Sequence, residues 1–292
     1  MPSTQQYALP DVLVDTEWLL QHHKDFSVRI AEVDYDPRAN YKRGHIPGAV
    51  LFSWKRDIND PVTRDILSKN KLLELFNRSG IKNDTTLVLY GDFNNWFAAF
   101  AFWVFKYYGV QNVKILDGGR KKWLLEKKPT TFDPRDKDGY ISGYPRDYLS
   151  ALKPDESLRA YRDYILKGLG DSTRVLVDVR DPQEFSGRIL APPGYPTEHA
   201  QRGGHIPGAL NIPWAQTVND ADGTFKSRKD LEALYTQKGV TPDKEVITYC
   251  RIGERSSHSW FVLKYLLGYP NVKNYDGSWT EWGNSIGIAI EK

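Results

Sequence analysis

The sequence predicts an α/β protein with two tandem domains, each a parallel sheet flanked by helices on both faces. Two observations carry this prediction. Short β-rich runs alternate with helical patterns along the chain, as expected for parallel strands joined by crossover helices. In addition, one set of motifs occurs twice in the same order. Two copies of roughly 120 residues each favour two globular domains over a solenoid.

The repeat is clearest in a Gly-His-Ile-Pro-Gly-Ala segment, which stands at residues 44–49 and again at 204–209. Further matches, in chain order, are Trp54 with Trp214, residues 87–90 with 246–249, and residues 109–119 with 268–278. Because the matches keep their order over most of the chain, the sequence indicates a tandem duplication.

The second copy shows the individual elements best. Residues 175–179 and 245–249 are short apolar runs rich in β-branched side chains and predict buried strands. Helical periodicity covers residues 229–238 and 256–267. Strands that alternate with helices in this way favour a parallel sheet, whose ligand sites lie at the carboxyl ends of the strands.

The boundary between the copies is predicted from composition. Residues 129–144 are rich in Asp, Gly, Pro and Lys and lack periodicity, which is typical of a connection. We therefore expect an amino-terminal domain over 1–128, a linker over 129–150 and a carboxy-terminal domain over 151–292.

The single cysteine, Cys250, is the main candidate for chemistry. It follows a predicted strand and precedes a predicted helix, so the loop between them aims backbone N–H groups at one point. Arg251 and Arg255 add positive charge. We expect the pKa of the thiol to fall from roughly 8.5 toward neutrality or below, although Glu254 opposes this.

The first copy differs at this place. Gly91 stands opposite Cys250, and residues 92–97 contain no arginine. Only the second domain is therefore expected to be catalytic.

These motifs together resemble a tandem-domain rhodanese, and most closely the actinobacterial-type thiosulfate sulfurtransferases. The resemblance covers nearly the whole chain. It rests on the duplicated segment, on Asp178-Val179-Arg180 followed by Glu184, on Cys-Arg-Ile-Gly-Glu-Arg at residues 250–255, and on residues 275–282.

The resemblance implies a persulfide relay. Cys250 would take the outer sulfur of thiosulfate, release sulfite, and pass the sulfur to cyanide or a thiol, as in thiosulfate:cyanide sulfurtransferase (EC 2.8.1.1). Arg255, Arg188 and Arg251 would bind the anionic donor. The amides of Ile252, Gly253 and Glu254 would stabilise the persulfide anion.

Three alternatives remain open. The chain could prefer 3-mercaptopyruvate, because Ile252 and Arg255 replace the lysine and threonine of the mitochondrial-type loop. It could be a sulfur carrier that delivers persulfide sulfur to a partner protein. A phosphatase of the same fold is disfavoured, because four residues separate Cys250 from Arg255 and such enzymes have five.

Further residues are expected to support the site. Asp178, Arg180 and Glu184 suit an ion-pair network at the end of a strand, with orientation of the loop as a second role. Trp96 and Phe97 match an aromatic pair that faces the cysteine across the domain interface in two-domain rhodaneses, although core packing explains them equally well. His45 and His205 are expected to stabilise turns.

Composition limits the remaining classes of function. The net charge of +3 is small and the basic residues are dispersed, so no nucleic-acid partner is expected. The sequence shows neither a long apolar run nor a signal peptide, and one cysteine allows no internal disulfide. We therefore expect a cytoplasmic enzyme that binds no membrane, metal or cofactor, and whose partners are a small sulfur donor and acceptor.

Overall fold

The computed structural model describes residues 7–132, 152–192 and 199–292. Its residues form two compact units. The amino-terminal unit comprises residues 11–155 and 220–224, and the carboxy-terminal unit comprises residues 1–10, 156–219 and 225–292. Each unit is described by itself.

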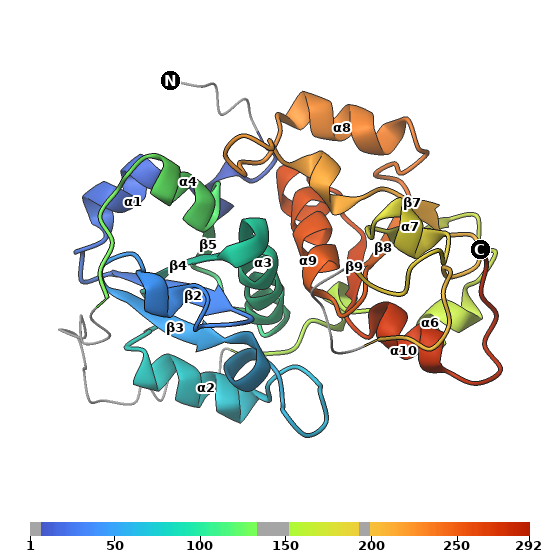
Figure 1. Ribbon diagram of the computed structural model, residues 1–292, viewed down its shortest axis with the longest axis horizontal. Coiled ribbons are helices and arrows are strands. Elements are labelled where there is room, and N and C mark those ends of the chain that lie inside the picture. The colour runs from blue at the N-terminus through green and yellow to red at the C-terminus, as the bar shows by residue number, and fades with distance from the viewer. Residues whose placement is uncertain (1–6, 133–151, 193–198) are drawn as a thin grey trace. The chain divides into compact units, whose positions relative to one another are not determined.

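The amino-terminal unit contains a parallel sheet with helices between its strands (Figure 1). Its strands are β1 (Leu13–Val14), β2 (Val28–Asp34), β3 (Ala49–Ser53), β4 (Thr86–Gly91) and β5 (Val113–Leu116). Its helices are α1 (Thr16–His22), α2 (Lys69–Arg78), α3 (Asp92–Tyr107) and α4 (Gly119–Leu125), with shorter turns at η1 (Pro10–Val12), η2 (Tyr41–Arg43) and η3 (Trp54–Ile58).

The five strands lie in the order β1-β5-β4-β2-β3, and every pair is parallel. Helices α1 and α4 cover one face, where Leu19 and Trp123 pack on strand residues such as Ile30. Helices α2 and α3 cover the other face, where the rings of Phe76 and Phe105 meet. Burial of both faces explains why these strands read as continuous apolar runs.

The carboxy-terminal unit repeats this plan. Its strands are β6 (Arg174–Asp178), β7 (Leu210–Asn211), β8 (Glu245–Tyr249) and β9 (Val272–Tyr275). Its helices are α6 (Arg162–Lys167), α7 (Pro182–Phe185), α8 (Arg228–Thr236), α9 (Glu254–Phe261) and α10 (Ser278–Asn284), with shorter turns at η4 (Glu156–Leu158), η5 (Trp214–Thr217) and η6 (Val262–Leu266).

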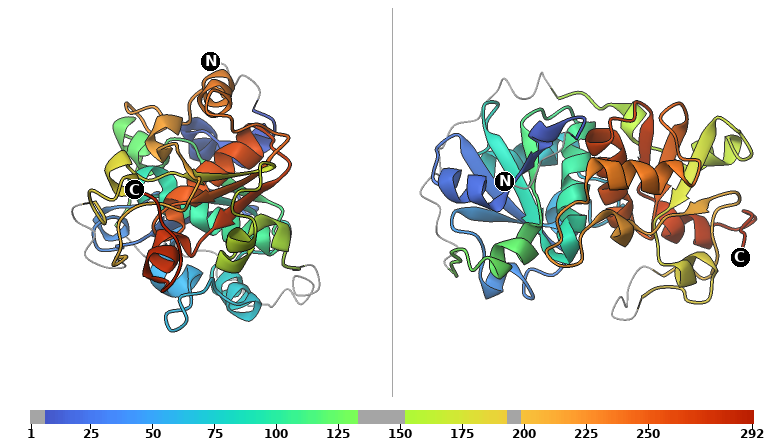
Figure 2. Two further views of the ribbon diagram at one scale, coloured as in Figure 1. Left: turned by 90° about the vertical axis from the view of Figure 1, so that its right-hand side faces the viewer. Right: turned by 90° about the horizontal axis from the view of Figure 1, so that it is seen from above.

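The four strands lie in the order β7-β6-β8-β9 and are again parallel. Helices α6 and α10 pack on one face through Ile165, Trp279 and Trp282. Helices α8 and α9 follow crossovers that run in the same direction along the sheet, so they cover the opposite face. The predicted α/β fold, with two parallel sheets each flanked by helices on both faces, is confirmed (Figure 2).

Each unit contains the same internal tertiary contact at matching positions, in agreement with the duplication. The hydroxyl of Tyr90 accepts a hydrogen bond from the amide of Ile46 at 3.0 Å. In the other unit, the hydroxyl of Tyr249 accepts one from the amide of Ile206 at 3.1 Å. Each tyrosine thus connects the repeated turn of its copy to the end of a central strand.

The units do not follow the chain as simply as the predicted boundaries 1–128, 129–150 and 151–292. Residues 7–10 belong to the carboxy-terminal unit, because the amides of Ala8 and Leu9 donate to the carbonyls of Leu266 and Tyr265 at 2.8 and 3.0 Å. Residues 220–224 belong to the amino-terminal unit, where Asp222 lies 3.5 Å from Lys122. Most of the predicted linker lies outside the described residues.

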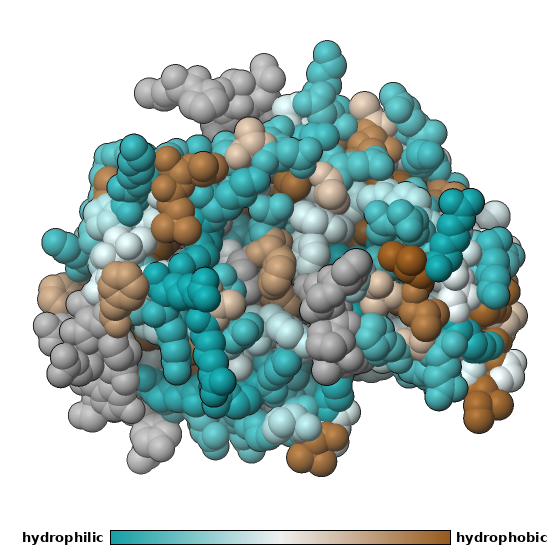
Figure 3. Space-filling view, in the orientation of Figure 1, coloured by the Kyte–Doolittle hydropathy of each residue, from teal (hydrophilic) through white to brown (hydrophobic). Residues whose placement is uncertain are grey.

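The described part of the face shown in Figure 3 is largely hydrophilic. In Figure 3 the hydrophobic residues of the face shown lie in small separate groups. Among the described residues, no helix has both the length and the apolar character needed to cross a membrane.

Candidate active site at the Cys250 loop

Cys250 begins the loop that joins β8 to α9, at the carboxyl end of a central strand. The residue is fully buried. Gly253 precedes α9 with a φ of 100°, a left-handed conformation that glycine adopts without steric cost. This tight turn brings the first residues of α9 back toward the sulfur. We call residues 250–255 the Cys250 loop.

The amide of Gly253 and the carboxylate of Glu254 both contact the sulfur directly. The amide of Gly253 donates a hydrogen bond to Cys250 Sγ at 3.2 Å. The thiol in turn donates to Oε2 of Glu254 at 3.3 Å. The neutral thiol is therefore both a donor and an acceptor, and the sulfur lies between a helix-initiating amide and a carboxylate.

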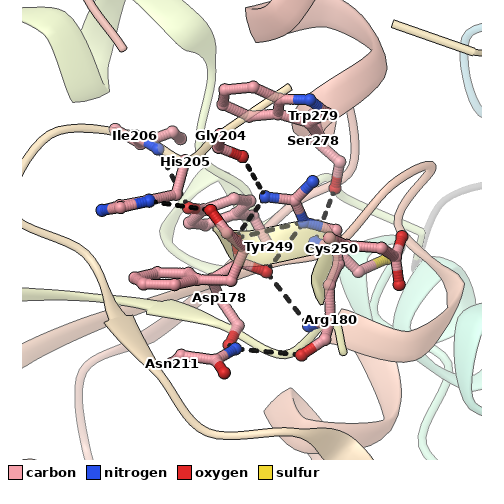
Figure 4. A network of polar contacts seen from close by, with 12 residues as sticks. Asp178, Arg180, Gly204, His205, Ile206, Asn211, Tyr249, Cys250, Ser278 and Trp279 are labelled. Atoms are coloured by element: carbon pink, nitrogen blue, oxygen red, sulfur yellow. Dashed lines mark hydrogen bonds and ion pairs between the residues drawn. The ribbon is translucent and has the colours of Figure 1, made fainter. Parts of the chain in front are cut away.

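The backbone of Cys250 is held by the start of α10 (Figure 4). Its amide donates to the Ser278 hydroxyl at 3.1 Å, and that hydroxyl donates to the carbonyl of Tyr275 at 2.7 Å. The carbonyl of Cys250 accepts from the amide of Trp279 at 3.0 Å. Each polar backbone group of Cys250 is thus paired, which holds the backbone of the residue in place.

Arg255 closes the loop through a buried ion pair. Its two terminal nitrogens donate to the two carboxylate oxygens of Glu184 at 2.7 and 3.0 Å. Its Nε lies 3.5 Å from Oε1 of Glu254. Although burial alone would raise it, the charge of Arg255 holds the pKa of Glu184 below its ordinary value. The fork-to-fork geometry is the strongest form of such a pair.

The expectation of a low thiol pKa is wrong for this arrangement. Burial raises the pKa of Cys250 above its ordinary value, and the charge of Glu254 raises it further, whereas Arg255 and the hydrogen bonds of Ser256 lower it. The main physical reason is burial, and the positive charge of Arg255 is in addition shared with two carboxylates. The sulfur therefore experiences little net positive charge from the loop.

The predicted strand-end network is present, but it consists of two separate ion pairs. Arg180 binds Asp178 through Nη2 and Oδ2 at 2.5 Å and also donates to the carbonyl of Gly204 at 2.7 Å (Figure 4). This pair joins the end of β6 to the repeated turn. Glu184 instead binds Arg255, so it is the residue of the three that contacts the Cys250 loop.

The remaining predicted site residues lie in different surroundings. Arg251 is buried within the loop, and its carbonyl accepts from the amide of Thr280 at 3.0 Å. Ile252 is also buried. Arg188 is exposed beyond α7, and no hydrogen bond or ion pair joins its side chain to another described residue.

Trp96 and Phe97 lie in α3 of the amino-terminal unit. Phe97 is buried, with its ring centroid 5.5 Å from that of Tyr35 and 5.4 Å from that of Trp54. Trp96 stacks on Phe93 at 5.3 Å. The contacts of Phe97 are aromatic core packing, whereas Trp96 is half-buried and its partner Phe93 is exposed. A role of the pair toward Cys250 stays a prediction.

The two repeated histidines take part in turn structure, as predicted. Nδ1 of His45 lies 3.0 Å from the carbonyl oxygen of Tyr41. Nδ1 of His205 lies 2.9 Å from that of Phe185, and its ring stacks on the Phe185 ring. Both histidines thus fasten the repeated segment to the chain before it.

In the first copy, an asparagine takes the bridging role that Ser278 has in the second copy. The side chain of Asn95 accepts from the amide of Gly91 at 3.0 Å and donates to the carbonyl of Leu116 at 2.8 Å. Gly91 and Leu116 correspond to Cys250 and Tyr275, whose backbone groups bind Ser278 in the second copy. One side chain therefore replaces another in the same bridging role.

Among residues 7–132, 152–192 and 199–292, no group of three or more His, Cys, Asp or Glu side chains could hold a metal ion.

Sequence reasoning missed two partners of the nucleophile. Ser278 is not among the predicted site residues, although its difference from Gly119 in the other copy is a usable signal. The sequence predicts that the charge of Glu254 opposes a low thiol pKa, but it does not predict that the carboxylate contacts the sulfur. The pattern Asp181-Pro182-x-Glu184 signals a capping box, which the structure contains, but nothing local predicts that Glu184 also binds Arg255.

Comparison with known proteins places the whole chain in one family. A model described as "Rhodanese-like domain" matches residues 15–126 and 162–285, one match in each half. The chain is similar to "Sulfur carrier protein TtuD" of Thermus thermophilus, with 54% identity over 98% of each chain. It is also similar to a Mycolicibacterium smegmatis protein named "Putative thiosulfate sulfurtransferase", with 51% identity over 97% of this chain and 99% of the relative.

Solved structures show the same architecture. The chain resembles EanB in its persulfide state with ergothioneine at a TM-score of 0.83 and 25% identity, over 99% of this chain and 72% of that one.

Proposed function

This chain belongs to the rhodanese family of sulfurtransferases, and we propose that it is a thiosulfate sulfurtransferase that works through a persulfide on Cys250. The observation that carries the proposal is the Cys250 loop, in which a buried thiol at a strand end receives the Gly253 amide at 3.2 Å. A loop of this size encloses one sulfur atom and offers amides to an anionic persulfide.

In the proposed cycle, Cys250 attacks the outer sulfur of thiosulfate and sulfite leaves. The persulfide then gives its outer sulfur to cyanide or to a thiol, which regenerates the enzyme. Forming a covalent intermediate divides one difficult transfer into two easier ones.

We assign donor binding to Arg255, Arg188 and Arg251. The structure constrains the part of Arg255, because Glu184 already engages both terminal nitrogens of its guanidinium. Arg255 would therefore act mainly by its charge and by closing the loop. The exposed Arg188 is the more accessible group for a sulfonate.

The test is a comparison of donors followed by mass analysis. Turnover with cyanide is measured with thiosulfate and with 3-mercaptopyruvate, and intact mass is recorded after the donor alone. We expect thiosulfate to be preferred and the protein to gain one sulfur atom. Cys250→Ser should fold normally and lose both signals, since a hydroxyl holds no sulfane sulfur. Thiocyanate formation by Cys250→Ser above about a tenth of the wild-type rate would contradict the mechanism.

A second candidate is a sulfur carrier that passes the persulfide to a partner protein, favoured by the similarity to "Sulfur carrier protein TtuD". Slow thiocyanate formation together with rapid transfer to a protein thiol would favour it. Either activity needs a reduced cysteine, which is consistent with our proposal of a cytoplasmic location.

A further inference from the structure

The carboxylate of Glu254 is placed to exchange a proton with the nucleophile. Its Oε2 accepts the hydrogen bond of the Cys250 thiol at 3.3 Å. Both residues are buried, with exposed fractions of 1% for Glu254 and 0% for Cys250. A proton acceptor must lie within hydrogen-bond reach of the proton that it takes, and Glu254 meets that condition.

The charged groups around the pair are few and each has a defined place. Oε1 of Glu254 faces Nε of Arg255 at 3.5 Å. From α7, Glu184 binds the other end of the same guanidinium. From α10, the group that faces Cys250 is the uncharged hydroxyl of Ser278. One carboxylate oxygen thus meets a cation while the other meets the thiol.

Charge conservation gives this arrangement a chemical advantage. A buried thiol that loses its proton to solvent adds a negative charge to the loop beside Glu254, which is costly in a site of low polarity. A thiol that passes its proton to Glu254 leaves the total charge of the loop unchanged. The carboxylate also becomes neutral just when a dianionic donor approaches.

We propose that Glu254 is the proton acceptor for Cys250 in persulfide formation and returns the proton when the persulfide is discharged. This inference rests on the proposed function.

Both steps balance. In the first, a sulfur–sulfur bond forms between Sγ and the outer sulfur of thiosulfate, and the bond to the sulfonate sulfur breaks. Its electron pair leaves with sulfite, and the thiol proton moves to Glu254. In the second, cyanide bonds to the outer sulfur, thiocyanate leaves, the Cys250 thiolate is restored, and Glu254 gives the proton back.

The alternative is that Glu254 only positions Arg255 and sets the charge near the sulfur. The two roles differ in the pH dependence of the donor half-reaction. With an internal proton acceptor, the reactive form arises without exchange of a proton with water, so the rate of sulfite release is independent of pH below the thiol pKa. With a positioning role, the rate follows the thiolate fraction and rises tenfold per pH unit.

The experiment measures single-turnover sulfite release from thiosulfate between about pH 6 and pH 8.5 for wild type and Glu254→Gln. We expect a flat profile for wild type. We expect a tenfold rise per pH unit for Glu254→Gln, which is about 10- to 100-fold slower than wild type near pH 6. If the rate of wild type also rises tenfold per pH unit, and the pH profile of the variant is only displaced along the pH axis, the proposal is wrong.

Two further variants keep the result interpretable. Glu184→Gln removes a buried carboxylate that binds Arg255 without contacting the sulfur, so its profile should stay flat even if its rate falls. Glu254→Asp keeps an acid at a longer distance and should restore part of the flat profile. Thermal melting confirms that each variant is folded.

Intact mass separates this proposal from the proposed function. If wild type gains no sulfur atom from thiosulfate, the proposed function fails. If it gains one but its rate follows the thiolate fraction, only the role of Glu254 fails.

Discussion

At the scale of single residues, carboxylates affect the charge around the Cys250 sulfur as much as arginines do. The loop carries two arginines, and this pattern predicts an acidic thiol. Glu184 and Glu254 compensate the charge of Arg255, and burial raises the pKa of the thiol. The arginine pattern alone therefore overestimates the positive charge at the sulfur.

The first prediction concerns the donor site. Arg255→Ala should lower kcat/KM for thiosulfate about a hundredfold, because the loop loses the charge that faces an anionic donor. The same change leaves Glu184 buried without its partner, which typically costs about 3–5 kcal/mol of stability. Initial rates and thermal melting are measured together.

The double variant Glu184→Gln/Arg255→Ala is the control, since it removes both partners of the buried pair. We expect it to recover stability and to stay inactive with thiosulfate. Wild-type activity in the double variant would mean that Arg255 only neutralises Glu184. If Arg188→Ala loses its activity with thiosulfate while Arg255→Ala keeps it, Arg188 is the main residue that binds the donor.

At the scale of elements, the two copies use different side chains for the same structural role. In each copy, one side chain bridges the end of a central strand and the end of the neighbouring strand. Ser278 bridges them in the carboxy-terminal unit, and Asn95 does so in the amino-terminal unit. A Cβ at Gly119 would lie 2.3 Å from the Asn95 carboxamide, so glycine is required there.

The second prediction is a coupled pair of substitutions in the amino-terminal unit. Asn95→Ala loses two buried hydrogen bonds, and Gly119→Ser clashes with Asn95, so each should destabilise by about 1–3 kcal/mol. The double variant recreates the serine bridge of the second copy. Ser278 shows that serine adopts the needed backbone, with a φ of 52° against 51° for Gly119.

Chemical denaturation of the four proteins gives the coupling energy. We expect the double variant to be more stable than the sum of the single effects by more than about 1 kcal/mol. Additive losses would show that the two bridges are not equivalent.

At the scale of the whole molecule, the two units carry buried titratable groups of opposite effect. In the amino-terminal unit, burial is the main reason why the pKa of Asp34 is raised to about 7 and that of Glu32 to about 8. In the carboxy-terminal unit, burial lowers the pKa of His258 to about 3. His258 lies beside the rings of Trp214 and Phe225.

The third prediction is that the pH decides which of the two units is the less stable one. A carboxyl with a raised pKa contributes stability that is complete below its unfolded pKa and is lost as pH rises through about 7 to 8. A histidine with a lowered pKa contributes stability that is lost as the pH falls below its unfolded pKa of about 6.5. Scanning calorimetry should therefore show the amino-terminal unit melting earlier at alkaline pH, and the carboxy-terminal unit earlier at acidic pH.

Two variants assign the transitions. Asp34→Asn should stabilise the amino-terminal unit at alkaline pH and change it little near pH 4, by linkage of the carboxyl to folding. His258→Phe should stabilise the carboxy-terminal unit below pH 6, with a gain of up to about 1.4 kcal/mol per pH unit. Equal effects of either variant at both ends of the pH range would contradict this assignment.

The sequence by itself determined the fold class and the duplication, and it pointed to Cys250, which we propose as the nucleophile. Strand and helix patterns depend on neighbouring residues, and the repeat and Cys250 can be read directly from the chain. The tertiary structure alone decided which charges meet at the sulfur. Arg255 and Glu184 are 71 positions apart. Strands β6 and β8 are adjacent and parallel, so the segments that follow them, which carry Glu184 and Arg255, meet at the carboxyl end of the sheet. The pKa of a buried thiol depends on such distant partners and on burial, and neither is encoded in the loop itself.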